Sequence, residues 1–483
     1  MRTAALADSF ADRILHHARL RPEKPAIILS DRVATYGMLA QGILRVENRL
    51  RTQNFASGAV IAIAVENPIR HITLAAALYR LGHPSLSIRR IEDVLPLDLP
   101  ITAFLHAANE KLHVGQRQIF VGDDWFEGGD RPITAAPAAG FTDERSVCRI
   151  ELSSGTTGRR KAVSLSVAAV YQWLTNYYPA IGLGLWDRLL SLPGLNSSWG
   201  FTLAAHALYA GKTLAFAQSA RDALNMIAVY GIDAVAASTQ QLSEIVREQT
   251  QAPVSCATLR AVHTGGSLLS RALMHDAGTK LCNAIVNQYG STEAGATAFA
   301  TIDRLIDIEG ATGYIAPWAQ VEVVDESDNR LPAGVAGILR IRSSCQAEPF
   351  PPGRADGHAG FRDGWFYPGD RGHVTADGLL VLSGRTSGVI NVGGVKIAPE
   401  VVEETLRLHP TVAEAVAIGK AGADGIEQII AIIVPRPPCN EQAIIDWCAQ
   451  HGVPVARVIV VDALPKTESG KIHRHLVVQQ YGG

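Results

Sequence analysis

Cysteines are few in this chain, and none of them are paired by spacing. The 483 residues hold six cysteines, and no CxxC pair occurs among Cys148, Cys256, Cys282, Cys345, Cys439 and Cys448. This scatter argues against a zinc site or a disulfide framework and is typical of reduced thiols. No run of about 18 apolar residues exists, which excludes a membrane-spanning helix. The amino-terminal segment also lacks the apolar stretch of a signal peptide. We therefore expect a cytoplasmic protein without a membrane span.

A surplus of either charge is missing as well. The chain has 44 Lys and Arg against 46 Asp and Glu, a net charge of -2, and charged residues make up 19 %. Such a balance gives no electrostatic reason to expect nucleic acid or an anionic membrane as the main partner. With 47 % hydrophobic residues the composition is that of an ordinary globular protein. Its length exceeds one typical core, so two or more domains are expected.

The order of apolar patterns predicts a layered α/β fold. A helix is predicted over 9–20, strands over 25–29 and 60–65, and a helix over 72–81. Similar alternation, with helices predicted over 201–210 and 220–230, runs from 187 to 237. Such alternation favours a substantially parallel sheet. After about residue 310, period-two patterns at 320–325 and 337–342 predict antiparallel β structure. The last hundred residues, with helices at 399–408 and 440–450, strands at 412–418 and 427–434 and a basic tail, suffice for a small α+β domain.

The domain prediction follows from these patterns. We expect a large N-terminal domain over residues 1–384, made of layered α/β subdomains plus a β-rich subdomain. A small, mobile α+β domain is expected over residues 385–483.

The segment from Glu151 to Lys161 is the first candidate site; it reads Glu-Leu-Ser-Ser-Gly-Thr-Thr-Gly-Arg-Arg-Lys. Glycines let the backbone turn through positive φ and approach a ligand closely. Successive N–H groups in such a turn form a concavity for anions. We expect phosphate to bind through Ser153, Ser154, Gly155, Thr156, Thr157, Gly158 and Lys161. The spacing matches neither the Walker nor the dinucleotide motif, so a polar surface loop is the alternative.

A second candidate site is the segment Asn287–Gly295, which follows the short apolar run 284–286 and is predicted to be a strand-end loop. Ligands bind at such places in α/β sheets. Its members suit a purine ring, phosphate oxygens and a magnesium ion; they are Tyr289, Gly290, Ser291, Thr292 and Glu293. The alternative is that Ser-Thr-Glu caps a following helix.

Three further motifs complete a recognisable set: Gly364–Asp370, the stretch from Gly384-Arg385 to Glu403, and Leu464–Arg474 with Lys471. Together with the two segments above, and with 21–26 and 31–36 near the start, they occur in the order and at the spacing of one family. The chain resembles the adenylate-forming superfamily, which includes acyl-CoA synthetases, nonribosomal-peptide adenylation domains and firefly luciferase. The resemblance covers nearly the whole chain.

The resemblance implies an ATP- and Mg²⁺-dependent enzyme and assigns roles to residues. The loop Ser153–Lys161 would hold the β- and γ-phosphates of ATP, and Thr292 would contact phosphate. Tyr289 would lie against adenine, with Gly265 and Gly266 on the other side, while Asp370 and Arg385 would bind ribose. Glu293 and Thr156 would hold Mg²⁺. Lys471 would bridge the attacking carboxylate and the α-phosphate.

In this family the small domain serves two half-reactions, adenylation and, after a large rotation, thioester formation. Here the second face would carry Gly393, Gly394 and Lys396, where the glycines let a pantetheine arm pass close to the backbone. The arm would belong to CoA or, as the alternative, to the phosphopantetheine of an acyl carrier protein.

The acyl pocket departs from the family pattern in a useful way. The segment Pro193–Phe201 places Asn196 where many CoA ligases carry histidine and Ser198 near the aspartate of amino-acid-activating domains. No acidic residue lies between Asp187 and Asp222, so an α-ammonium group would lack its usual partner. With Trp199 and Gly290 also expected in the pocket, an aryl or apolar acid is favoured.

Two other departures concern the moving parts. Ser387 and Gly388 occupy the hinge, where an aspartate or lysine is usual, and Arg160 and Ala162 replace the usual proline and glycine of the phosphate loop. The main hypothesis is an AMP-forming acid–thiol ligase that makes an acyl-CoA from a small carboxylic acid, acting as a monomer or homodimer. The alternatives are an acid:carrier-protein ligase, a degenerate nucleotide-binding homologue and a luciferase-like oxidoreductase.

Overall fold

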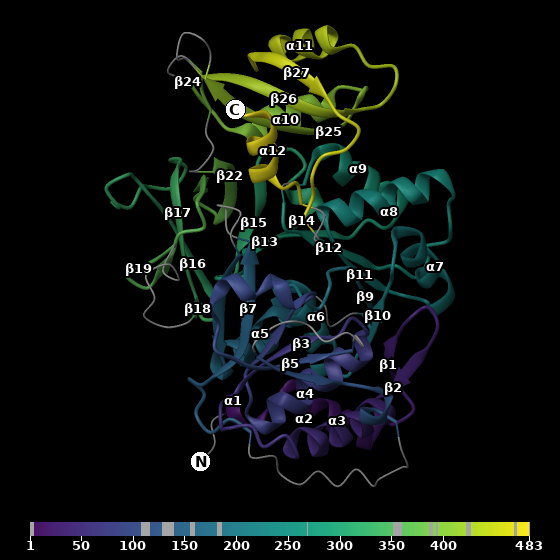
Figure 1. Cartoon of the computed structure of the whole chain (residues 1–483). Helices are drawn as coiled ribbons and strands as arrows, with labels where there is room; N and C mark the ends of the chain where they lie inside the picture. Colours follow the sequence, from purple (N-terminus) through teal and green to yellow (C-terminus); the bar gives the residue numbers. More distant parts are fainter. Residues whose placement is uncertain are drawn as a thin grey trace.

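Two large mixed β-sheets and a smaller three-stranded sheet organise the chain (Figure 1). The computed structural model describes residues 4–107, 116–127, 140–154, 160–180, 186–267, 269–350, 360–385, 390–392, 395–421, 427–467 and 471–482. The two large sheets lie in the part of the chain that precedes residue 386, and the small one lies in the C-terminal part.

The larger sheet has fifteen strands among the described residues and changes from parallel to antiparallel along its width. In spatial order its strands are β19 (Phe361–Arg362), β20 (Trp365–Phe366), β17 (Gly337–Ser343), β21 (Asp370–Val374), β22 (Leu379–Arg385), β15 (Ala311–Ile315), β14 (Gly295–Thr301), β13 (Ile285–Ser291), β12 (Ala261–Gly265), β11 (Ala234–Ser238), β9 (Arg188–Ser191), β10 (Thr213–Phe216), β1 (Pro25–Ile28) and β2 (Val33–Thr35), with β16 (Ala319–Val324) paired to β17. Neighbours from β1 to β13 are parallel, and neighbours from β13 to β22 are antiparallel. The predicted parallel sheet and the antiparallel region after residue 310 are both confirmed.

The second sheet carries the candidate phosphate segment. Its spatial order is β18 (Glu348–Pro349), β8 (Arg160–Ser166), β7 (Val147–Ser154), β4 (Ser85–Ser87), β3 (Val60–Ala64), β5 (Ile101–His106) and β6 (Arg117–Phe120). The strands β7, β4, β3, β5 and β6 are parallel to one another. The strands β7 and β8 form an antiparallel hairpin.

Helices cover these sheets and bury two main apolar cores. The helices are α1 (Ala4–Ala7), α2 (Phe10–Leu20), α3 (Tyr36–Arg51), α4 (Pro68–Leu81), α5 (Val167–Ala180), α6 (Ser198–Tyr209), α7 (Ala220–Tyr230), α8 (Thr239–Gln251) and α9 (Arg271–Lys280), with short 3-10 turns at Ile91–Asp93, Leu95–Leu97, Asp123–Trp125 and Ile302–Arg304. One core packs α2, α3, α4 and α6 together, and another lies under α7, α8 and α9. No helix of the described chain has the length and apolar character needed to cross a membrane.

Capping residues set where the site-bearing helices begin. The predicted helix 72–81 begins earlier, at Pro68, because Pro68 takes the first helical position and Asn67 accepts from the Arg70 N–H. The helix predicted over 201–210 begins at Ser198, because the Ser197 hydroxyl accepts from the Gly200 N–H. Both corrections lengthen a helix toward the cavity described below.

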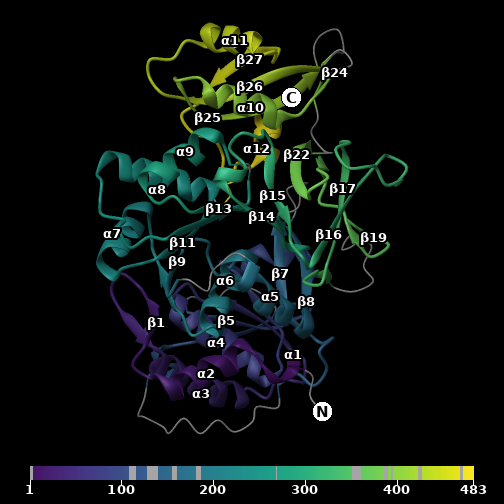
Figure 2. The same cartoon turned by 180° about the vertical axis from the view of Figure 1, so that it is seen from behind.

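The C-terminal part folds around its own core. It contains β23 (Ile390–Val392), β24 (Val395–Ile397), α10 (Pro399–Leu408), β25 (Val412–Ala421), β26 (Glu427–Pro435), α11 (Glu441–Gln450), β27 (Val455–Val460) and α12 (Arg474–Tyr481). The expected basic tail contains a helix over Arg474–Tyr481, which buries Val477 against β25 and β26. Figure 1 and, from behind, Figure 2 place this C-terminal unit against the end of the larger sheet, near β22 and α9. The boundary between 384 and 385 stays a prediction.

One loop expectation was also wrong. The segment around Tyr289 is not a loop, because β13 runs from Ile285 through Ser291 and pairs residue by residue with β14. The hydrogen-bond ladder continues past the apolar run that marked the strand in the sequence. Tyr289 is therefore held by a strand, and only Thr292, Glu293 and Ala294 form the turn.

Candidate active site

One cavity of about 2680 Å³ gathers the predicted residues from both large sheets and from the C-terminal unit. Its walls include Ser153, Lys161, Asn196, Ser198, Trp199, Gly265, Gly266, Tyr289, Gly290, Ser291, Thr292, Glu293, Asp370 and Lys471. These residues are spread over more than three hundred positions of the sequence, from Ser153 to Lys471. The fold therefore brings together every predicted site residue whose side chain it describes.

Tyr289 and Asp370 meet across the larger sheet. The Tyr289 hydroxyl donates to Asp370 Oδ2 over 2.6 Å. Tyr289 comes from β13, and Asp370 is the first residue of β21, where its backbone pairs with Arg385 of β22. The bond holds an aromatic face and a carboxylate at fixed separation. Of Arg385 only the backbone is described.

Gly265 is the last residue of β12, and Gly266 directly follows it. Both line the same cavity as Tyr289, and neither carries a side chain that would fill it. A Cβ on Gly265 would come 2.6 Å from the carbonyl oxygen of Gln288, so only glycine fits there. Gly266 has φ +91°, a left-handed conformation that L side chains rarely adopt. A Cβ at Gly266 would lie 3.5 Å from Lys471 Cε and 3.7 Å from its Nζ. The lysine of the C-terminal unit therefore reaches the glycine end of the large unit's site.

The turn after β13 presents Thr292 and Glu293 to the cavity. The Ser291 hydroxyl accepts from the Ala294 N–H at 3.0 Å, and the Ala347 N–H donates to the Glu293 carbonyl at 2.7 Å. The alternative of a helix cap is wrong, because the next element is β14. Within the described ranges, no group of three or more His, Cys, Asp or Glu side chains is placed to hold a metal ion. A single half-buried carboxylate suits Mg²⁺ that takes its other oxygens from nucleotide phosphates and water.

The described ends of the predicted phosphate segment belong to the paired strands β7 and β8. Ser153 pairs with Lys161, and the backbone of Ser154 pairs with that of Arg160. Ser153 is 5 % exposed, and its Oγ has no hydrogen-bond partner among the described residues. Gly155, Thr156, Thr157 and Gly158 lie outside the described residues. Ser153 and Lys161, near the two ends of the segment, thus line the cavity from neighbouring strands, and the phosphate-binding role of the segment stays a prediction.

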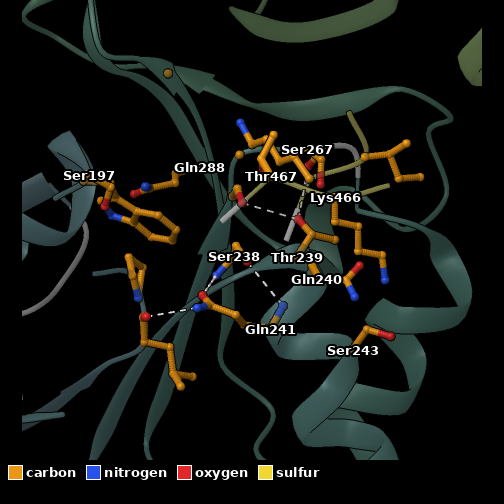
Figure 3. A pocket seen from close by; sticks show the side chains of 18 of the residues that line it. Ser197, Ser238, Thr239, Gln240, Gln241, Ser243, Ser267, Gln288, Lys466 and Thr467 are labelled. Atoms are coloured by element: carbon orange, nitrogen blue, oxygen red, sulfur yellow. Dashed lines mark hydrogen bonds between the residues drawn. The ribbon is translucent and has the colours of Figure 1, made fainter. Parts of the chain in front are cut away.

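Backbone hydrogen bonds join Lys471 and the residues after it to the segment 465–467. The Thr467 N–H donates to the Lys471 carbonyl at 2.6 Å, and the His473 N–H donates to the Pro465 carbonyl at 2.7 Å. Figure 3 shows Lys466 and Thr467, which precede Lys471, on the same side of the cavity as Thr239 and Ser267 of the large unit. The Thr239 hydroxyl donates to the Ser267 carbonyl at 3.2 Å.

An ion pair between Arg474 and Glu403 links the residues that follow Lys471 to the rest of the C-terminal unit. Arg474 Nη2 lies 2.5 Å from Glu403 Oε1, and the same oxygen accepts from the Ala417 N–H at 2.9 Å. Glu403 is 4 % exposed, and burial raises the pKa of its carboxyl, an effect that Arg474 opposes. Nearby, Lys466 pairs with Glu414 at 2.8 Å. The position of Lys471 therefore depends on contacts within α10, β25 and α12.

The other end of the cavity is largely aromatic. Ser198 and Trp199 form the first turn of α6, and Asn196 lies in the loop before it. Trp173, which the sequence had marked as an aromatic candidate beside the pocket, and Trp318, which it had not, also line this end and donate to the carbonyls of Cys345 and Ala296 over 2.9 Å each. Trp318 stands in a turn without a distinguishing pattern, so no sequence signal marks it.

Some of the predicted residues lie wholly or partly outside the described part of the chain. Gly393 and Gly394 lie outside the described residues, as do Ser387 and Gly388 at the expected hinge. Lys396 is described only in its backbone, as part of β24. Their roles stay predictions.

Comparison with known families accounts for most of the chain. The AMP-binding enzyme family matches residues 14–349, and the AMP-binding enzyme C-terminal domain matches residues 401–471. A fatty acid–[acyl-carrier-protein] ligase, ScoC of Streptomyces coeruleorubidus, is 25 % identical over 97 % of this chain and 95 % of its own length. A 2-succinylbenzoate–CoA ligase of Bacillus licheniformis is 26 % identical over 95 % of this chain and 97 % of its own.

The solved structures give the same picture of the fold. The o-succinylbenzoate coenzyme A synthetase of Bacillus subtilis, in complex with ATP and a magnesium ion, superposes with a TM-score of 0.84 at 21 % identity. The superposition covers 96 % of this chain and 98 % of that one. At this identity the likeness establishes a shared architecture of a large and a small unit. Because the family match spans well over half of the residues, the chain belongs to the AMP-binding enzyme family.

Proposed function

We propose that the protein is an ATP- and Mg²⁺-dependent carboxylic acid ligase that forms an acyl-adenylate and then an acyl thioester. The observation that carries this proposal is the approach of Lys471 to Gly266, in a cavity that also holds the Tyr289–Asp370 pair and Glu293. A cation, an aromatic face and two carboxylates then surround one space. This combination suits a reaction at the phosphate of a nucleotide.

In the first half-reaction, a carboxylate oxygen of the acid attacks the α-phosphorus of ATP and pyrophosphate leaves. The two reactants are both anions, so cations and hydrogen-bond donors must offset their repulsion. We assign this role to Lys471, to Mg²⁺ held by Glu293 and Thr156, and to Thr292. The Ser153–Lys161 hairpin would hold the leaving pyrophosphate, with Ser153 Oγ as one donor.

The nucleoside would lie between the ends of β12 and β13. Tyr289 would cover one face of adenine, with Gly265 and Gly266 on the other side. Asp370 would accept hydrogen bonds from the ribose hydroxyls, with Arg385 beside it. The 2.6 Å bond from Tyr289 to Asp370 supports this assignment, because it fixes the ring and the carboxylate relative to each other.

The acid would enter between α6 and the end of β13 that holds Gly290. The lining of Trp199, Trp173 and Trp318 favours an aryl or apolar acid. The sequence between Asp187 and Asp222 contains no acidic residue to pair with an α-ammonium group, which argues against amino acids. His206 also lines this end, and burial lowers its pKa to about 3, so it is neutral at physiological pH.

In the second half-reaction a thiol attacks the acyl carbon and AMP leaves. We propose CoA as the thiol, with Gly393, Gly394 and Lys396 along the path of its arm and a hinge at Ser387. A carrier-protein phosphopantetheine is the second candidate, because one relative is a fatty acid–[acyl-carrier-protein] ligase. We also propose that residues 1–384 and 385–483 move as separate domains between the half-reactions, and that the protein acts in the cytoplasm, where its six free cysteines stay reduced.

A panel assay tests the proposal. Aryl, short-chain and medium-chain acids are screened for acid-dependent exchange of pyrophosphate into ATP, and then for thioester formation with CoA and with a phosphopantetheinylated carrier protein. The proposal expects exchange with at least one apolar or aryl acid. ATP binding without exchange for any acid would identify a degenerate homologue, and oxygen uptake without thioester formation would favour a luciferase-like reaction.

A further inference from the structure

A buried polar network lies behind the candidate phosphate hairpin and is not used by the proposed chemistry. Arg149 and Glu151 of β7 are 3 % and 1 % exposed, and Arg149 Nε donates to Glu151 Oε1 over 2.8 Å. Ser85 and Ser87 of β4 are also buried, and they accept from Arg149 Nη1 and Nη2 over 3.2 and 2.6 Å. The parallel pairing of Ser85 with Arg149 sets these groups side by side.

The network continues in a defined direction to α4. A guanidinium only donates, so Ser87 Oγ accepts from Arg149 and has its own proton to give to His71 Nε2, 2.6 Å away. His71 Nδ1 then carries the ring proton and donates to the Val65 carbonyl at 2.9 Å. This tautomer is neutral, in agreement with burial, which lowers the pKa of His71 to about 4. Val65 and His71 both line the cavity.

A second arm of the network reaches α6. The Arg149 guanidinium carbon lies 3.5 Å from the centre of the Phe201 ring, a cation–π contact in a buried environment. Phe201 belongs to the second turn of α6, directly after the turn formed by Ser198 and Trp199. The Arg149 guanidinium therefore contacts β4, which pairs with β7 of the phosphate hairpin, and α6, which lines the acyl pocket.

The strand geometry leads from this network into the site. Alternate residues of a strand share a face, so Arg149, Glu151 and Ser153 form one row along β7. Ser153 ends the row in the cavity, beside Lys161. A displacement of Arg149 would thus be transmitted to Ser153 through one intervening residue of the row, Glu151.

Stability alone does not account for such a network. Replacing a buried ion pair by apolar residues of similar volume is often neutral or stabilising. We propose that Arg149 is a positioning residue, which fixes the phosphate hairpin and the acyl-pocket helix relative to each other for adenylation. This inference rests on the proposed function for the reaction it serves. The predicted dependence of ATP affinity on Arg149 can be measured even if the proposed ligase reaction is wrong.

The first experiment replaces the pair as a unit. The variant Arg149→Met with Glu151→Leu removes the network without leaving an unpaired charge. The matched control is Arg80→Met with Glu47→Leu, because Arg80 and Glu47 form another buried pair, at 3.1 Å between α4 and α3, outside the cavity. Urea unfolding, ATP affinity by calorimetry and pyrophosphate–ATP exchange are measured for both full-length variants.

Both variants are expected to stay folded, whereas only the Arg149 variant loses function. Its ATP dissociation constant should rise about tenfold and its exchange kcat/KM should fall by about 10²-fold, the scale of a 1 Å misplacement. The inference is overturned if the two pairs affect ATP affinity and exchange equally. If the wild-type chain shows no exchange with any acid, the proposed function fails, and the ATP affinities alone decide the inference.

A double-mutant cycle separates positioning from general packing. The single changes Arg149→Met and Phe201→Leu should each raise the KM for the acid, and their combination should raise it no further than the larger single effect. Arg149→Lys should not restore the wild-type KM, because a lysine lacks the planar fork that reaches two serines and the ring. Multiplicative effects in the cycle, or full rescue by lysine, would refute the positioning role.

Discussion

The two halves of the candidate site are held in different ways. The nucleotide half belongs to the larger sheet, where Tyr289 and Asp370 come from ordered strands and bond to each other at 2.6 Å. The lysine half belongs to the C-terminal unit, where the Lys471 carbonyl accepts from the Thr467 N–H and the nearby Arg474 pairs with Glu403. Lys471 meets the large unit beside Gly266.

This difference separates binding from chemistry. We expect a site built within one sheet to bind ATP whether or not the C-terminal unit is in place. A lysine delivered by a separately folded unit acts only when the units are apposed, as they are in Figure 2. Changes in the two halves should therefore affect different steps, and the following predictions use that separation.

The largest effect is expected from Lys471→Ala. Loss of this cation should lower acid-dependent pyrophosphate–ATP exchange by about 10²–10³-fold, the usual cost of one preorganised electrostatic contact. ATP affinity and thioester formation from supplied acyl-adenylate should change little. The control is Lys466→Ala, which removes a neighbouring lysine that is paired with Glu414. Equal loss in both half-reactions would contradict the role given to Lys471.

A smaller effect is expected from Arg474→Ala, which removes the ion pair with Glu403 close to Lys471. Exchange should fall by about tenfold to 10²-fold, because Lys471 is no longer held in register with the α-phosphate. ATP affinity, measured by calorimetry, should stay within about twofold of the wild type because the nucleotide half is intact. Unfolding in urea shows whether the unpaired Glu403 also destabilises the C-terminal unit. Exchange at the wild-type rate in a folded variant would contradict the anchoring role.

The sequence predicted Lys471 from the motif that surrounds it. It predicted the nucleotide-binding residues from the residue types gathered in their segments. Elements with strong periodicity, such as 9–20 and 399–408, appear as α2 and α10 within about one residue. The strand through Tyr289 was missed because Asn287, Gln288 and Gly290 lack β propensity, and the ladder to β14 forms only in the folded chain.

Several contacts between distant segments could not be predicted from the sequence. Nothing in the sequence marks Trp318 as a pocket residue or Arg474 as the partner of Glu403. Arg149 and Glu151 read as an alternating strand with polar residues on one face, which normally indicates solvent. Their burial depends on β4, α4 and α6, which come from other parts of the chain.

A moderate effect, confined to binding, is expected from Tyr289→Phe. The variant keeps the ring and loses the bond to Asp370, so ATP affinity should fall by about tenfold, the value of a hydrogen bond to a charged group. The kcat of exchange at saturating ATP should change little. The control is Tyr230→Phe on α7, outside the cavity. A fall in kcat with unchanged ATP affinity would reverse the division between the halves.

The smallest effect on function is expected from His263, which lies on β12 next to the site but does not line the cavity. Burial lowers its pKa to about 4, below the value of about 6.5 in an unfolded chain. The unfolded state then binds more protons between these values, so stability is lost as the pH falls through that window.

His263→Phe should reduce this loss. Urea midpoints at pH 7 and pH 5 should lie closer together in the variant than in the wild type, and ATP affinity at pH 7 should be unchanged. The control is His275→Asn, a change at an exposed position of α9. An unchanged difference between the two midpoints would show that His263 does not contribute to the acid sensitivity.

The path of one oxygen atom tests the central claim most directly. Acids of the panel are labelled with ¹⁸O in the carboxylate and incubated with the full-length protein, ATP, Mg²⁺ and CoA, and the phosphorus products are analysed by mass spectrometry. Attack of the carboxylate on the α-phosphate followed by release of AMP predicts one ¹⁸O in AMP and none in pyrophosphate. ADP as the product, or AMP without label for every acid, would contradict the account.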